Sequence, residues 1–179
     1  MQLAPTSRWT TPTIEFFLLE PSDVEATYVS WLNDPLVGRY LESRFATHTL
    51  DSTRHFVQTC RQSDRALFLG IRSRLLDLRH VGNIKIEPID RRHGLGEVGI
   101  LIGDRAAWGK GLASDSIRAL AMIAREELSL RKLTAGCYAS NIGSQKAFLR
   151  AGFEVEGRRP GHFLLDGKPE DLVLMAKVL

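Results

Sequence analysis

A chain of 179 residues, of which 44% are hydrophobic, is long enough to bury one sizeable core without disulfide or metal support. Its net charge of +3 comes from scattered positive residues rather than one basic stripe, so nucleic-acid binding is a minor hypothesis. Cys60 and Cys137 stand far apart without a CxxC spacing, which is typical of buried thiols in a reducing compartment.

Neither a targeting segment nor a membrane span is expected. The N-terminus lacks an apolar core behind basic residues, and no apolar run approaches the roughly 18 residues of a span. We therefore predict a cytoplasmic protein. The histidines His48, His55, His80 and His93 show no metal-ligand spacing, so no metal is expected.

Taken in order, the chain begins with residues 1–12, which are polar and carry Pro5 and Pro12. This composition predicts a loose N-terminal arm on a single domain of residues 1–179. Residues 13–20 are predicted to form a first strand.

A first helix is predicted next, with Ser22 and Glu25 spaced as a capping box and a stop at Asn33-Asp34-Pro35. Residues 36–47 are expected to be irregular. The remaining elements are predicted at these residues: a helix at 49–62, strands at 66–71, 81–89 and 96–103, a helix at 114–129, a strand at 133–139, a helix at 141–151, and strand segments at 153–157, 162–165 and 171–178. This order predicts one mixed α/β unit.

A glycine turn lies between the strand at 96–103 and the helix that follows, in the segment DRAAWGKGLA at 104–113. Gly109 and Gly111 allow a tight turn and leave no side chain over its N–H groups. The helix beginning there directs unpaired N–H groups and the positive end of its dipole into the turn. This arrangement favours phosphate or pyrophosphate, and ordinary loop glycines are the alternative.

Two better-known phosphate motifs do not fit this segment. A P-loop requires GxxxxGK[ST], and the segment lacks both the span and the hydroxyl residue. A dinucleotide-binding fingerprint requires a third glycine, where this chain has Ser114, and it normally opens a domain.

A second segment, from Asn141 to Phe153, carries the string NxxSxxxFxxxGF some 30 residues after the glycine turn. The two segments in this order resemble the GNAT superfamily of acyl-CoA-dependent N-acyltransferases. The resemblance covers nearly the whole chain and is strongest to the RimJ/RimL-like branch. It implies a GNAT-like acyl-CoA N-acyltransferase fold, an α+β mixed sheet of about six to seven strands flanked by about four helices.

The resemblance implies acetyl-CoA (coenzyme A) as cosubstrate. The pantetheine arm would lie between the strands at 97–102 and 133–139, which splay apart in this fold, and the pyrophosphate on the N–H groups of 109–113. The implied cofactor contacts are Leu101, Ile102, Trp108, Gly109, Lys110, Gly111, Leu112, Ala113, Asn141, Ser144 and Phe148.

Two positions qualify this assignment. Ala106 stands where the superfamily pattern has Gln or Arg, with Arg105 one residue away. Asn141 is a favoured N-cap residue at the start of its helix, and the resemblance adds a contact of its amide with the cofactor arm.

Acetylation of an amine needs a base for the amine proton, a donor for the developing oxyanion and an acid for the leaving thiolate. Glu97 is the predicted base, because a carboxyl group on a mostly apolar strand would have a raised pKa. A glutamate paired with an arginine at a strand edge is the alternative. The oxyanion donor is expected to be a backbone N–H near Ile100 or Leu101.

The acid is harder to place, because Phe148 stands where many superfamily members have tyrosine. Ser144 and Tyr138 carry the nearby hydroxyl groups, and Ser144 is the second predicted catalytic residue. The acid role is also open to water.

Acceptor contacts are expected from the first two helices, the 36–47 segment and the late hairpin. The candidate side chains are Tyr40, Glu42, Arg44, His162 and Asp171. Glu42 and Asp171 would suit a cationic amine, whereas Arg44 with Arg158 and Arg159 would suit a phosphate. Each is also explained as an ordinary surface residue.

These features predict an N-acetyltransferase that moves acetyl from acetyl-CoA to a primary amine by direct attack in a ternary complex. The favoured acceptor is a small metabolite such as an amino sugar, a nucleotide-linked amino sugar or a polyamine. A protein N-terminus is the alternative acceptor, and a non-catalytic acyl-CoA-binding regulatory module is the alternative from another class. No nucleic acid or membrane partner is expected, and the oligomeric state stays open, with a homodimer as one option.

Overall fold

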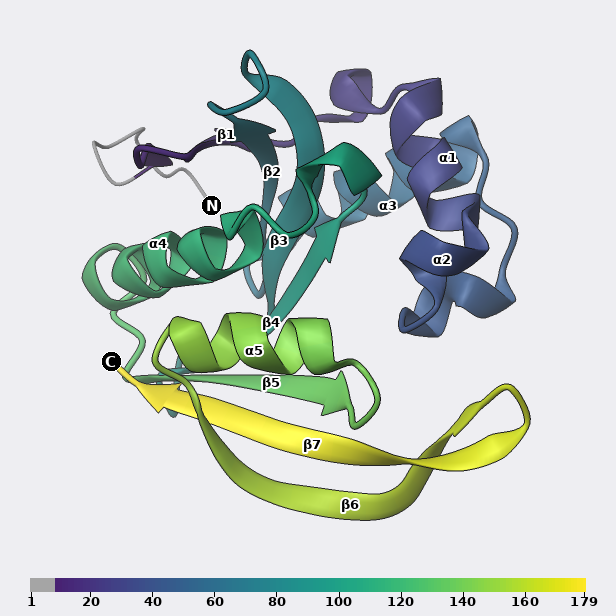
Figure 1. The fold of residues 1–179 in the computed structure, drawn as a ribbon. Helices are drawn as coiled ribbons and strands as arrows, with labels where there is room; N and C mark the ends of the chain where they lie inside the picture. The colour runs from purple at the N-terminus through teal and green to yellow at the C-terminus, as the bar shows by residue number, and fades with distance from the viewer. Residues whose placement is uncertain (1–8) are drawn as a thin grey trace.

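A seven-stranded mixed sheet forms the centre of the computed structural model, which describes residues 9–179 (Figure 1). Its strands are β1 (Ile14–Leu18), β2 (Leu67–Ser73), β3 (Arg79–Asp90), β4 (Leu95–Ile102), β5 (Lys132–Tyr138), β6 (Glu154–Leu165) and β7 (Lys168–Val178). They lie in the order β1-β2-β3-β4-β5-β7-β6, and every neighbouring pair is antiparallel except β4 and β5. The predicted α/β fold with a mixed sheet is confirmed.

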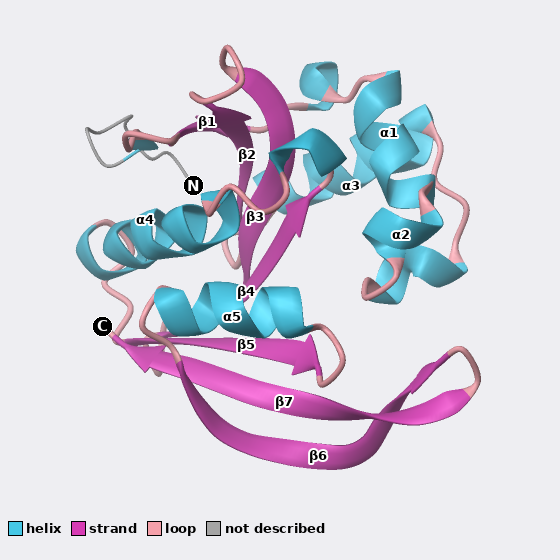
Figure 2. Cartoon of the chain, viewed as in Figure 1, coloured by secondary structure: helices cyan, strands magenta, loops and turns pink. Residues whose placement is uncertain are grey.

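Five α-helices flank this sheet in the described residues (Figure 2). They are α1 (Ala26–Asn33), α2 (Pro35–Gly38), α3 (Leu50–Gln62), α4 (Leu112–Glu126) and α5 (Ile142–Arg150). The helix beyond the expected four is α2, four residues long, in the segment predicted to be irregular. It forms because Pro35 suits the first helical position and the Asp34 side chain accepts from the N–H of Leu36 at 2.8 Å.

The core divides into two clusters because successive strand residues point to opposite faces of the sheet. On β2, Leu67 and Leu69 belong to the main cluster, which also contains the inner face of α4. Phe68 between them belongs to a second cluster beneath α1 and α3. The two helical layers therefore cover opposite faces.

The start of the first helix differs from the prediction. Ser22 and Glu25 form no capping box, because Pro21–Asp23 is a separate 3-10 turn and α1 begins only at Ala26. The turn is closed by the N–H of Glu20, which donates to the Asp23 carboxylate at 2.7 Å.

The predicted loose arm at 1–12 falls mainly on residues 1–8, which lie outside the described residues. From Trp9 onward the chain is packed: this indole is 4% exposed in the main core, and Thr10 bridges to Glu15. Within residues 9–179, no helix combines the length and the apolar character that a membrane span requires. Cys60 and Cys137 are both free and buried.

The feature that positions the site is the short pairing between β4 and β5. Their register contains only three pairs and ends at Glu97 opposite Thr134. Beyond that pair, β4 continues along β3 while β5 continues along β7, and the two strands diverge (Figure 1). The splayed strands expected at 97–102 and 133–139 are present.

Candidate functional site

Glu97 stands at the vertex of the gap between β4 and β5, in the last pair before the strands separate. Its neighbour Val98 is buried in the main core, so Glu97 belongs to the opposite face, the one covered by α1 and α3. The side chain of Glu97 is exposed, so it lacks the apolar surroundings that the sequence predicts for it. No arginine among residues 9–179 forms an ion pair with it, which leaves the carboxylate accessible from the gap.

The glycine turn at the end of β4 has the conformation that its sequence predicts. Gly109 has φ of +73° and Gly111 has φ of +78°, a left-handed backbone that other residues rarely adopt. Gly111 is the N-cap of α4, a 15-residue helix whose first N–H groups and positive dipole end point into the turn. Lys110 is exposed between the glycines, and Leu112 is buried behind them. This backbone cradle fits a phosphate group.

The segment before the turn is held by two contacts of Asp104. Its carboxylate accepts from the N–H of Ala106 at 2.9 Å, which caps the 3-10 turn Arg105–Ala107. The other carboxylate oxygen pairs with Arg79 at 3.0 Å. Arg105 is exposed, with its guanidinium 6.0 Å from the Trp108 ring centroid.

One backbone group near the predicted cofactor arm already has a partner. The carbonyl of Ile102 accepts from the indole N–H of Trp108 at 2.7 Å, whereas the sequence predicts free backbone groups near Leu101 and Ile102. The half-exposed Trp108 ring folds back along the strand to reach it. Open edge groups of β4 are therefore those between Glu97 and Ile102, including the backbone near Ile100 and Leu101.

The start of α5 lies across the gap from the glycine turn. Asn141 caps this helix by accepting from the N–H of Ser144 at 3.1 Å. The Ser144 hydroxyl is 3.4 Å from the Cys137 sulfur, which belongs to the main core. Phe148 is 2% exposed and packs edge-on against Phe153 at 4.9 Å. Ser144 therefore lies on the main-core face of the sheet and Glu97 on the other.

Three of the five predicted acceptor residues meet at Tyr138, the last residue of β5. The Tyr40 ring lies 5.6 Å from the Tyr138 ring, and Arg44 donates to the Tyr138 hydroxyl at 2.9 Å. That hydroxyl donates in turn to the Glu42 carboxylate. Tyr138 lies on the same face as Glu97, about 13 Å beyond the vertex by the rise of a strand.

Burial and the hydrogen bond to Glu42 raise the pKa of Tyr138 above the ordinary value of a phenol, against the opposing effect of Arg44. The hydroxyl is therefore protonated at neutral pH. A protonated phenol thus lies on the same face of the sheet as Glu97, and it is one of the two nearby hydroxyl groups, Tyr138 and Ser144, that the sequence offers.

Arg44 is occupied by the protein itself. It also donates to the carbonyls of Leu41 at 2.8 Å and Leu164 at 2.9 Å, and its side chain is 17% exposed. Arg44 joins the 36–47 segment to β5 and to the β6–β7 hairpin, which leaves fewer of its donors open to the phosphate that the sequence suggests.

The other two predicted acceptor residues are placed differently. His162 is exposed and packs edge-on against Phe163 at 4.8 Å. Asp171 accepts from the N–H of Gly161 at 2.9 Å, at the register shift in β6, and so shapes the hairpin. Sequence reasoning missed Phe163, which stacks on Tyr138 at 4.3 Å, because nothing local to residue 163 signals a partner on β5.

A match to a family model identifies the group of proteins to which this chain belongs. The model described as "Acetyltransferase (GNAT) domain" matches residues 14–154, from β1 to the first residue of β6. This chain belongs to the GNAT acetyltransferase family. The predicted superfamily is thereby confirmed, and the match supports an acyl-CoA-dependent N-acetyltransferase.

Curated relatives of this acetyltransferase come from Bacillus subtilis (strain 168). The chain is 26% identical over 151 residues to the uncharacterized N-acetyltransferase YoaA, covering 83% of this chain and 84% of the relative. It is 33% identical over 73 residues to the probable N-acetyltransferase YjcK. That second match covers 41% of this chain and spans only 40% of the relative's length.

Solved structures share the fold of this acetyltransferase. A RimL ribosomal L7/L12 α-N-protein acetyltransferase in complex with coenzyme A has a TM-score of 0.84 at 21% identity, covering 94% of this chain and 96% of that one. A spermidine N-acetyltransferase from Vibrio cholerae, in complex with CoA and spermine, has a TM-score of 0.82 at 18% identity, covering 92% and 95%. These likenesses show that the chain shares the fold of both proteins. In residues 9–179 no three His, Cys, Asp or Glu side chains are grouped to hold a metal ion.

Proposed function

We propose that this chain transfers an acetyl group from acetyl-CoA to a primary amine, in a ternary complex at the β4–β5 gap. The observation that carries the proposal is the separation of β4 from β5 directly after the Glu97–Thr134 pair, with a left-handed glycine turn where β4 ends. The open strand edge offers backbone groups to an extended pantetheine arm. The turn at 109–113 offers N–H groups to the pyrophosphate.

Glu97 is the proposed base. Its carboxylate takes the proton of the attacking amine, directly or through a water, as the amine nitrogen bonds to the thioester carbonyl carbon. A backbone N–H near Ile100 or Leu101 would stabilise the negative charge on the carbonyl oxygen. Breaking the C–S bond then releases the thiolate of coenzyme A, which needs a proton.

Tyr138 and Ser144 are the proposed donors of that proton, with water as a third source. Tyr138 lies on the same face as Glu97 and keeps its proton at neutral pH. Ser144 lies on the other face, 3.4 Å from Cys137. The two side chains approach the gap from opposite sides, so single variants at each distinguish them.

A small cationic amine is the acceptor we favour. The Glu42 carboxylate pairs with Arg44 at 3.4 Å and accepts from Tyr138, yet its side chain is 60% exposed beside the Tyr40 and Tyr138 rings, a setting that suits an ammonium-bearing molecule. The engagement of Arg44 by Leu41, Tyr138 and Leu164 disfavours a phosphate-bearing acceptor. The spermidine acetyltransferase among the structural neighbours supports this choice.

A protein N-terminus is the second candidate acceptor. It is favoured by the RimL neighbour, whose name describes α-N-acetylation of ribosomal L7/L12. Both candidates present a primary amine to the same gap, so the proposed role of Glu97 as base applies to either acceptor.

The experiment is thiol release from acetyl-CoA in the presence of single amines: amino sugars, their nucleotide-linked forms, polyamines and short peptides with free N-termini. We expect stimulation by one class, with polyamines or amino sugars ahead of peptides. Stimulation by peptides alone would move the assignment to protein N-termini. If no amine stimulates thiol release while coenzyme A still raises the melting temperature, the result would support an acyl-CoA-binding module instead.

A further inference from the structure

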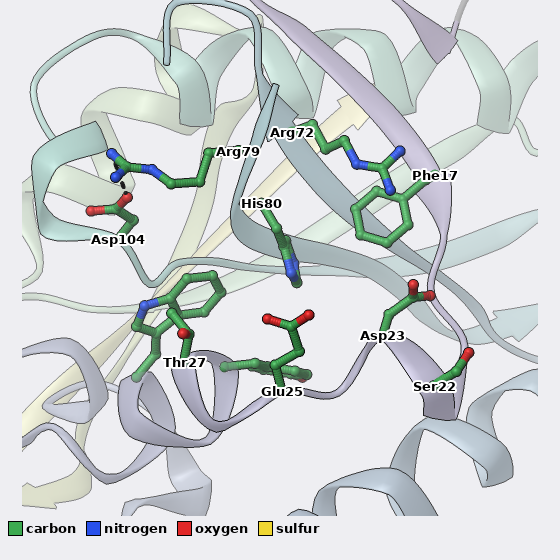
Figure 3. A pocket seen from close by; sticks show the side chains of 11 residues that line it. Phe17, Ser22, Asp23, Glu25, Thr27, Arg72, Arg79, His80 and Asp104 are labelled. Carbon is green, nitrogen blue, oxygen red and sulfur yellow. Dashed lines mark ion pairs between the residues drawn. The ribbon is translucent and has the colours of Figure 1, made fainter. Parts of the chain in front are cut away.

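A second hollow lies apart from the β4–β5 gap, between the start of α1 and the β1–β2–β3 part of the sheet (Figure 3). Its volume is about 660 Å³, within the range of small-molecule sites. The sheet residues that line it belong to β1, β2 and β3, whereas the transfer gap opens between β4 and β5. Asp104, before the glycine turn, also lines it, but none of its lining residues is among those proposed for acyl transfer.

Aromatic rings gather around His80 in this hollow. The His80 ring lies 5.1 Å from the ring of Phe17, 5.1 Å from Trp31 and 6.0 Å from Tyr28, each at a steep interplanar angle. Tyr28 and Trp31 pack against each other at 5.9 Å. The hollow is therefore lined by several π-systems, which attract cations.

The hydrogen bonds of His80 determine which ring nitrogen is an acceptor. Nε2 lies 2.9 Å from the carbonyl oxygen of Gly82 and 3.0 Å from Oδ1 of Asn83. A carbonyl oxygen only accepts, so Nε2 carries the hydrogen. Burial lowers the pKa of His80 and keeps the ring neutral at pH 7, so Nδ1 is an acceptor.

The positive side chains around the hollow are already paired. Arg72 lies 3.7 Å from the Glu15 carboxylate and stacks over the Phe17 ring at 4.1 Å. Arg79 pairs with Asp104 at 3.0 Å, as the dashed line in Figure 3 marks. Each guanidinium therefore already has an acidic partner within the protein.

The negative side chains are less committed. Asp23 accepts the N–H of Glu20 and forms no ion pair within the described part of the chain. Glu25, at the N-terminal end of α1, points its carboxylate into the hollow toward His80 (Figure 3). Over residues 9–179 its side chain has no ion pair or hydrogen bond. The hollow therefore combines hydrogen-bond acceptors with aromatic rings, and its two arginines already have acidic partners.

We propose that this hollow binds a small organic ammonium ion, separately from the acyl-transfer site. The ammonium group would donate to the Glu25 carboxylate and to Nδ1 of His80, and its alkyl part would lie against the Phe17, Tyr28 and Trp31 rings. The ligand class follows from the charges: an anion would meet two unpaired carboxylates.

The test is calorimetric titration of the full chain, without acetyl-CoA, with butylammonium as probe and butyrate as its anionic counterpart. We expect saturable binding of butylammonium only. Glu25→Gln should weaken that binding at least about tenfold, while Glu154→Gln, which alters an exposed glutamate on β6, should leave it unchanged. Because Glu25 is exposed, the variant should keep its fold, which its melting temperature verifies.

A further variant, Glu42→Gln, separates this hollow from the proposed acceptor region beside Tyr138. The inference is overturned if butyrate binds as well as butylammonium, if no saturable binding occurs, or if Glu42→Gln removes the binding and Glu25→Gln does not. None of these measurements needs acetyl transfer, so the failure of this inference and the failure of the proposed function give different results.

Discussion

Arg44 donates a 2.9 Å hydrogen bond to the phenol oxygen of Tyr138, a residue 94 positions further along the chain. The same guanidinium donates to the carbonyls of Leu41 and Leu164. Beside it, Arg39 pairs with Asp166 at 2.8 Å in the turn between β6 and β7. These contacts fasten the segment after α2 to the end of β5 and to the hairpin, which builds one wall of the proposed acceptor site.

Replacing Arg44 tests whether this wall matters for the acceptor. Arg44→Ala should lower the free energy of unfolding by about 1–3 kcal/mol, because three carbonyl or hydroxyl oxygens lose a charged donor. It should also raise the KM of the acceptor while leaving the KM of acetyl-CoA nearly unchanged. Urea denaturation and steady-state kinetics measure the two effects. Arg92→Ala, at an exposed position in the turn between β3 and β4, is the control, and equal effects of both variants would contradict the role of Arg44.

Glu97→Gln tests the proposed base. The variant keeps the size of the side chain but removes its basic form, so turnover should fall roughly 10²–10⁴-fold. Binding of coenzyme A, followed by the rise in melting temperature, should be retained because Glu97 is not part of the glycine turn. An unchanged rate at the optimal pH would assign the base to another group or to water.

Gly111→Glu tests the position of the pyrophosphate. A glutamate at φ of +78° would be strained and would place a negative charge at the N-terminus of α4, so coenzyme A should no longer protect the protein against thermal unfolding. Gly167→Glu is a matched control, since Gly167 has φ of +76° in the β6–β7 turn with no atom near its added Cβ. Protection by coenzyme A should survive there. Survival in both variants would refute the placement.

His80 predicts a pH dependence of stability. Burial holds its pKa in the folded state below 6.5, its ordinary value, and nearby Arg72 lowers it further, against the hydrogen bonds to Asn83 and Gly82 and the charge of Asp23. As the pH is lowered, this histidine therefore takes up its proton at a higher pH in the unfolded chain than in the folded chain. The free energy of unfolding should decrease as the pH falls through 6.5 toward the folded pKa.

Replacement of this histidine checks that slope. Chemical denaturation of His80→Gln at a series of pH values between about 7 and 5.5 should show a smaller decrease than the original protein. The same change at the exposed His93 should keep the original slope. If both variants retain the original slope, the titration of His80 does not contribute to the pH dependence of stability.

Local sequence signals predicted the parts of this fold that short-range physics controls. The glycine spacing at 109 and 111 predicted a tight turn, and the structure forms it with a left-handed backbone at both glycines. Asn141 at the head of its segment predicted the cap of α5. The capping box at Ser22 failed for the same kind of reason, because Asp23 competes locally and closes a 3-10 turn instead.

Contacts between distant segments lay beyond such signals. The occupation of the Ile102 carbonyl by Trp108, and the engagement of Arg44 by its four partners, depend on where side chains fold back in space. The stacking of Phe163 on Tyr138 likewise depends on the register between β5, β7 and β6. Neither periodicity nor residue type records that register.

The amino-acid sequence by itself determined the element order, the glycine turn and the membership of the GNAT family, because propensity, backbone freedom and motif spacing are local properties. Tertiary structure alone decided that the pairing of β4 with β5 ends at the Glu97–Thr134 pair and that Arg44 bonds to the end of β5. It also decided that Glu25 and His80 face a shared hollow (Figure 3). Those outcomes follow from strand register and packing, which bring together residues that the chain keeps far apart.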